Sequence, residues 1–85
     1  MNVELRFFAS VREVLGTSAE TVSLPPEVKT VGDVRRFLMT RGGKWSEALA
    51  EGKNLRMACN QQMCDASTRI AEGSEVAFFP PVTGG

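Results

Sequence analysis

The sequence contains no histidine, and this absence restricts its chemistry more than any other feature. Histidine is the usual general base and a common zinc ligand, and Ser/His and Cys/His catalytic pairs depend on it. The only two cysteines, Cys59 and Cys64, have a C-x4-C spacing that differs from the C-x-x-C of redox and zinc sites. We therefore expect no metal site and no catalysis by an internal side chain.

An excess of charge of one sign is also missing. Lys and Arg total 10 and Asp and Glu total 10, so no basic excess is available to neutralise nucleic-acid phosphates or to bind an anionic membrane. Residues 1–15 lack the pattern of a signal peptide, and no stretch approaches the ~20 apolar residues of a membrane span. With so few cysteines, these features predict a cytoplasmic protein without nucleic-acid or membrane partners.

The chain does have a strand pattern at its N-terminus, and its length of 85 residues suffices for one small domain. Phe8 falls on the outward face of a predicted strand whose inward positions are Val3, Leu5 and Phe7. Ser10 is expected to cap a helical turn over residues 11–15 that ends at Gly16. Residues 21–24 predict a second strand, which is closed by two prolines.

One amphipathic helix is predicted over residues 30–41. Thr30 and Asp33 have the spacing of a capping box, and the apolar positions that follow recur at helical spacing until two glycines stop the pattern. A further helical turn over residues 44–49 is expected to place two apolar side chains on the core, Trp45 and Leu49. Two later strands, over residues 55–59 and 75–79, complete an α+β domain in which one sheet packs against one main helix.

The chain ends in an unusual way, because the strand over residues 75–79 runs directly into the segment Pro80-Pro81-Val82-Thr83-Gly84-Gly85. We divide the chain into a domain over residues 1–79 and an extended tail over residues 80–85. The prolines favour an extended backbone, and glycines without Cβ atoms can pass a narrow channel. The tail thus presents the α-carboxylate of Gly85, which must be activated by a nucleotide-using partner, since this chain has no phosphate-binding loop.

The last eleven residues, EVAFFPPVTGG, closely resemble the end of the molybdopterin synthase small-subunit family, and residues 5–16 are similar to that family's opening strand and turn. The resemblance implies a ubiquitin-like β-grasp fold with a mixed sheet, one main helix and a flexible Gly-Gly tail. It implies that an E1-like enzyme uses ATP to adenylate Gly85, which then becomes a thiocarboxylate. Gly84 would let the tail enter a large catalytic subunit, where sulfur passes to a cyclic pyranopterin phosphate.

The resemblance also implies how the chain takes part in catalysis. It would be no enzyme on its own and would bind no cofactor; it would be the sulfur-donating subunit of a complex that contains two small and two large subunits. One face of its sheet would meet both partners, through positions that match Phe8, Arg12, Met63 and Phe79, together with tail residues Pro80, Pro81, Val82 and Thr83. The outward positions of Phe8 and Phe79 support this face independently, although a short helix could instead cover it.

Other interpretations of the sequence remain open. The chain could be a sulfur carrier for thiamine synthesis or tRNA thiolation, a ubiquitin-like modifier that forms isopeptide bonds with lysines, or an interaction domain with an idle tail. The cysteines do not separate these alternatives. Cys59 is expected to be a small apolar core residue, and Cys64, in the hairpin that follows, has no nearby base to activate it.

Overall fold

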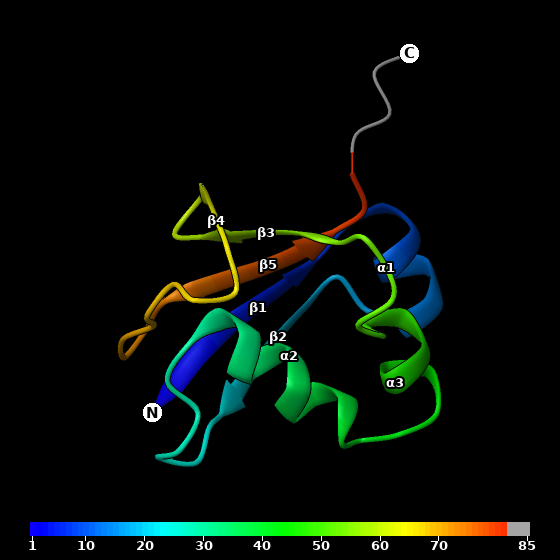
Figure 1. Cartoon of the computed structure of the whole chain (residues 1–85). Coiled ribbons are helices and arrows are strands. Elements are labelled where there is room, and N and C mark those ends of the chain that lie inside the picture. Colours follow the sequence, from blue (N-terminus) through cyan, green and yellow to red (C-terminus); the bar gives the residue numbers. More distant parts are fainter. Residues whose placement is uncertain (82–85) are drawn as a thin grey trace.

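The computed structural model describes residues 1–81 of the chain. Its elements, in chain order, are β1 (Asn2–Phe7), α1 (Ala9–Leu15), β2 (Ala19–Ser23), α2 (Val31–Met39), α3 (Lys44–Ala48), β3 (Arg56–Cys59), β4 (Gln62–Cys64) and β5 (Glu75–Phe79). The strands form one mixed sheet in the order β2-β1-β5-β3-β4, in which β1 and β5 are parallel and the other neighbours antiparallel (Figure 1). This is the ubiquitin-like β-grasp architecture that the resemblance implied.

The core lies between the sheet and the helices. Burial alternates along β1, so that Val3, Leu5 and Phe7 are buried while the residues between them are exposed. The Phe7 ring stacks on Phe78 at a centroid distance of 6.4 Å and meets Trp45 edge-on at 5.7 Å. Trp45 therefore packs on the core, as predicted from the sequence.

The capping box predicted at Thr30 and Asp33 is present. The Asp33 N–H donates to Thr30 Oγ1 at 3.1 Å, and the Thr30 N–H donates to the Asp33 carboxylate at 3.2 Å. The helix is shorter than predicted and ends at Met39, because the backbone then tightens into turns in which Arg41 and Gly42 each donate to the carbonyl three residues earlier. The main helix was thus correctly predicted in type and start but not in length.

The start of α1 differs from the sequence-based prediction. Phe8 is the N-cap residue and makes no side-chain cap, whereas Ser10 lies inside the helix, so the prediction that Ser10 caps it is wrong. The physical reason is that the chain turns sharply at Ala9, which has a φ of 52°. The helix therefore begins before Ser10, and Ser10 is not at the N-cap position. The predicted end is confirmed, since Gly16 has a φ of 74° and its N–H donates to the Arg12 carbonyl.

The segment after Cys59 contains a short strand that the sequence analysis described only as a hairpin. Asn60 and Gln61 both have positive φ, of 52° and 67°, and form a two-residue turn that pairs β3 with β4. Asn60 also ties this turn to β5, because its N–H donates to the Glu75 carbonyl and its side-chain oxygen accepts from the Glu75 N–H. The hairpin is therefore fixed to the sheet at its tip.

Candidate functional site

The candidate site is the outward face of the sheet where β5 ends. Phe8 directly follows β1 and Phe79 ends β5, and their rings meet edge to face with centroids 6.2 Å apart. Half of the Phe8 surface is exposed, at 50%, although α1 follows it immediately. The outward orientation predicted for both side chains is confirmed, and α1 leaves Phe8 half exposed. We call Phe8 and Phe79 the aromatic pair.

The backbone at the junction of β1 and α1 positions Phe8. Its N–H donates to the Phe78 carbonyl at 3.3 Å, which extends the pairing of β1 with β5 by one residue. Its carbonyl accepts from the Arg12 N–H at 3.3 Å and so begins α1. The chain turns sharply at Ala9, so Phe8 keeps its strand orientation while the helix leaves the sheet.

The strand register places Met63 on the same outward face. Ala77 of β5 lies opposite Ala58 of β3, and Ala58 lies opposite Met63 of β4. Directly opposed residues of antiparallel strands share a face, and Met63 has 64% of its surface exposed. The structure therefore brings three of the predicted residues onto one face, with Met63 separated from the aromatic pair by small alanines.

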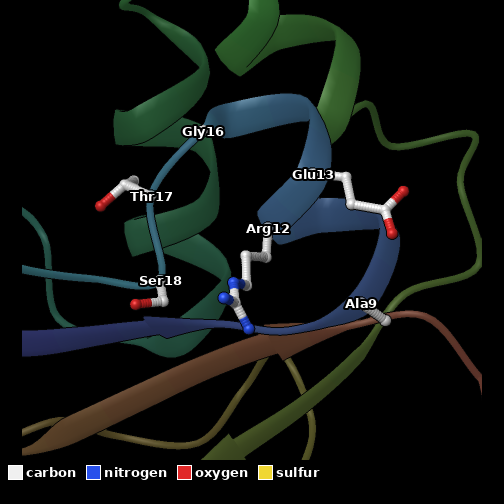
Figure 2. A pocket seen from close by; sticks show the side chains of 6 residues that line it. All are labelled: Ala9, Arg12, Glu13, Gly16, Thr17 and Ser18. Atoms are coloured by element: carbon white, nitrogen blue, oxygen red, sulfur yellow. The ribbon is translucent and has the colours of Figure 1, made fainter.

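Arg12 lies at the margin of this face, on α1. It lines a polar hollow together with Ala9, Glu13, Gly16, Thr17 and Ser18, and Figure 2 shows its guanidinium directed toward Ser18 while the Glu13 carboxylate points away. The hollow lies where the end of α1 returns to the sheet. Arg12 thus extends the polar rim of the face toward β2.

The tail leaves the sheet beside the aromatic pair. Pro80 and Pro81 follow β5 directly and are half-buried, and β5 ends next to α1 (Figure 1). The other predicted tail residues lie outside the described part of the chain: Val82, Thr83, Gly84 and Gly85. The sheet therefore delivers the start of the tail from the end that carries Phe8 and Phe79.

The two cysteines do not form a reactive centre. Both are free and half-buried, and both pack against the core. Burial raises the pKa of the Cys64 thiol, and a hydrogen bond with Thr68 offsets this only in part, so the nucleophilic thiolate is a small fraction at neutral pH.

Within residues 1–81, no three His, Cys, Asp or Glu side chains gather in a way that could hold a metal ion. No helix of the same described range is long and apolar enough to cross a membrane.

Arg56 belongs to the same face but was missed in the sequence analysis. It is exposed and lies directly opposite Phe79 in the pairing of β3 with β5. Its place between the inward residues Leu55 and Met57 was a usable signal, because an outward position on a strand can be recognised by alternation. Alternation along one strand does not reveal which residue of the neighbouring strand lies beside Arg56.

Comparison with known proteins gives this geometry a family. The sequence model of the ThiS family matches residues 5–85. The molybdopterin synthase sulfur carrier subunit of Haemophilus influenzae is 43% identical over 79 residues, which cover 93% of this chain and 94% of that protein. The Escherichia coli protein of the same name is 41% identical over 83 residues, covering 98% and 99%. Small archaeal modifier protein 3 of Haloferax volcanii is 32% identical over 93 residues, covering 100% of both chains.

Solved structures agree on the fold. A crystal structure of SAMP1 from Haloferax volcanii superposes with a TM-score of 0.76 at 26% identity and covers 100% of both chains. A chain from a complex of subunits 1 and 2 of molybdopterin-converting factor from Helicobacter pylori gives a TM-score of 0.68 at 23% identity, again with 100% of both chains covered. From the family match over residues 5–85 and the relatives above 40% identity, this chain belongs to the ThiS family.

Proposed function

We propose that the chain is the sulfur-carrier small subunit of molybdopterin synthase and that its C-terminal Gly85 carries the sulfur. The observation that supports this most strongly is the identity of 41–43% with proteins of that name over nearly their whole length. The aromatic pair at the start of the tail supports it as well, because Phe8 is exposed and Phe79 half-buried, and exposed aromatic residues are typical anchors of protein interfaces.

The proposed chemistry takes place at the terminal carboxylate. An E1-like enzyme binds ATP, and an oxygen of the Gly85 carboxylate attacks the α-phosphate, so that an acyl adenylate forms and pyrophosphate leaves. A sulfur nucleophile then attacks the acyl carbon, the bond to AMP breaks, and a thiocarboxylate remains. This sulfur passes to a cyclic pyranopterin monophosphate held by the large subunit, and two such transfers complete one dithiolene.

Each part of the chain has a separate role in this proposal. The aromatic pair, Arg12 and Met63 bind the activating enzyme and the large subunit in turn, while Pro80 to Thr83 lead the tail into the partner and Gly84 passes its narrowest point. The chain itself binds no cofactor and catalyses nothing alone. The Helicobacter pylori structure, which is a complex of two subunits, supports a large-subunit partner. We propose a cytoplasmic assembly of two small and two large subunits.

Reconstitution tests the proposal directly. The protein is incubated with ATP, the E1-like enzyme and a sulfur donor, and its intact mass is then measured. We expect a mass gain equal to the difference between sulfur and oxygen, followed by formation of molybdopterin when the large subunit and the pterin precursor are added. A chain that is activated but never gains sulfur would contradict the proposal, as would a loaded chain that makes no molybdopterin.

A second candidate function is protein modification, which the similarity to small archaeal modifier protein 3 favours. The same adenylate would then pass to a lysine amine and form an isopeptide bond. Tagging the N-terminus and searching cell extracts for conjugates that carry the C-terminal Gly-Gly on lysine separates the two functions. Abundant conjugates without any thiocarboxylate would favour the modifier.

A further inference from the structure

The arginines of the described chain differ in whether they already have a partner. Arg6, Arg36 and Arg41 pair with carboxylates, and Arg35 donates to backbone carbonyls. Within residues 1–81, no carboxylate forms an ion pair with the three exposed arginines that remain: Arg12, Arg56 and Arg69. Two of these three flank the aromatic pair.

Arg56 and Arg12 lie on opposite sides of the aromatic pair. Arg56 is directly opposite Phe79 across the β5–β3 pairing, and Arg12 is one helical turn after Phe8. The order of the sheet places β3 and β2 on opposite sides of the β1–β5 centre, and Arg12 is directed toward the β2 side (Figure 2). The start of the tail therefore has an arginine on each side, with Glu13 next to Arg12 on α1.

The two carboxylates on the central strands of this face, Glu4 and Glu75, lie toward its other end and are already engaged. Glu4 accepts a hydrogen bond from the Thr21 hydroxyl at 2.8 Å, and Glu75, at the start of β5, lies 3.8 Å from Arg6.

Of the carboxylates nearer the tail, Asp65 follows β4 and accepts from Ser67, and Glu13 lies next to Arg12 with its carboxylate directed away from the guanidinium (Figure 2). The chain has no net charge, so this arrangement of charge is a local property of the face. Its tail end carries two arginines without an ion pair among the described residues, and the carboxylates of its far end are engaged within the molecule.

We propose that Arg56, together with Arg12, makes the border of the aromatic pair electropositive. The surface of the partner protein that binds the aromatic pair is then acidic. The apolar centre of the face favours a protein over a nucleic acid, because Phe8, Phe79 and Met63 would leave phosphates without donors. Charges at the rim of an interface act mainly on the association rate. Arg56 therefore guides the tail toward its receiving site, and the aromatic pair supplies most of the affinity.

The test rests on the proposed function and compares two charge reversals in the full chain. Arg56→Glu reverses a charge at the border of the aromatic pair. Arg69→Glu reverses a charge beside Thr30, at the N-terminus of α2, and the segment 69–73 that follows adjoins the start of β1. Association with the large subunit and with the E1-like enzyme is followed by stopped flow at low and high salt. We expect Arg56→Glu to slow association about fivefold to tenfold at low salt and to approach the wild-type rate at high salt, while Arg69→Glu changes little.

The outcomes separate this inference from the function on which it rests. If wild-type protein binds both partners and donates sulfur, yet the two reversals associate equally fast, the inference is wrong and the function stands. If wild-type protein binds neither partner, the inference and the proposed function are both wrong. A labelled single-stranded oligonucleotide is the remaining probe. If wild-type protein binds it and Arg56→Glu abolishes this binding, the border binds a polyanion, and the proposal of an acidic protein partner is wrong. Thermal melts of both variants show whether either reversal unfolds the domain.

Discussion

At the scale of single residues, the phenylalanines at the ends of β1 and β5 form two pairs that face opposite sides of the sheet. Phe7 and Phe78 are fully buried and stack in the core, whereas Phe8 and Phe79 meet on the outward face. One step along a strand reverses the face, so neighbours of identical chemistry contribute to different properties. The inner pair stabilises the fold, and the outer pair is free to bind.

Alanine substitutions at these four positions should separate stability from binding. Phe7→Ala or Phe78→Ala should lower the free energy of unfolding by about 3–5 kcal/mol, because each leaves a cavity in the core. Phe8→Ala or Phe79→Ala should instead weaken partner binding by about 2 kcal/mol or more. Denaturant unfolding and calorimetric titration of the same variants measure both quantities. Equal losses of stability at all four positions would contradict the assignment.

Gly32 is a second residue whose size matters. A Cβ atom at this position would lie 2.9 Å from the Ala66 Cβ and 3.0 Å from the Ala66 carbonyl oxygen, to which the Gly32 N–H donates. We expect Gly32→Ala to lower the free energy of unfolding by about 1–3 kcal/mol, although alanine is the better helix former. Gly52→Ala is the control, because no described atom beyond the two neighbouring residues lies within 4 Å of a Cβ placed there. A Gly32→Ala protein more stable than wild type would contradict the prediction and show that the segment around Ala66 shifts to make room for the methyl group.

At the scale of elements, α2 is held at its first turn by two sets of contacts. The capping box satisfies donors within the helix, and the N–H groups of Val31 and Gly32 donate to the carbonyls of Thr68 and Ala66 at 2.9 Å. The second set joins the helix to the segment between β4 and β5. The main helix and the connection to the last strand therefore support each other.

The carboxylate of Asp33 makes this element sensitive to acid. Hydrogen bonds from the Lys29 N–H, the Arg36 guanidinium and Thr30 lower the pKa of Asp33 from 3.8 to about 2. Because the folded-state pKa is depressed, its stabilising contribution is complete above pH 3.8 and is lost as the pH falls through about 2. Asp33→Asn should therefore destabilise the protein at neutral pH, and its difference from wild type should shrink in acid. Urea unfolding between neutral pH and pH 2 measures this; a difference independent of pH would contradict it.

At the scale of the whole molecule, the tail leaves from the middle of the sheet. β5 lies between β1 and β3 and is paired on both sides, so the residue before Pro80 is held by two neighbouring strands. A central strand opens less readily than an edge strand. A partner can therefore bind the tail without loosening the domain that presents it.

Changes at the last residue should affect function and leave the fold intact. Residues 80–85 contain no periodic apolar set, so deleting Gly85, or adding one residue after it, should change the free energy of unfolding by less than about 0.5 kcal/mol. The same changes should abolish sulfur transfer, since the acyl carbon is then absent or displaced. Thermal melts and the reconstituted molybdopterin assay measure the two effects. Molybdopterin formed by an extended and untrimmed chain would refute the role of Gly85.

Local patterns in the sequence were sufficient for much of the architecture. Alternation along β1 located the core side and the outward Phe8, and the spacing of Thr30 and Asp33 marked the start of α2. The resemblance of the first and last segments identified the family, which the match to the ThiS family over residues 5–85 and the relatives above 40% identity confirm. These features depend on residues close together in the chain, whose geometry follows from backbone periodicity and side-chain chemistry.

Contacts between distant segments had to come from the tertiary structure. Alternation with its two apolar neighbours could have marked Arg56 as an outward residue, but only the pairing of β3 with β5 placed it beside Phe79. In the same way, only the fold places Arg12 and Arg56 on either side of the aromatic pair, and Gly32 has no room for a side chain because Ala66 packs against it. Strand register and loop docking join residues that are far apart in the chain, and each depends on how the whole core packs.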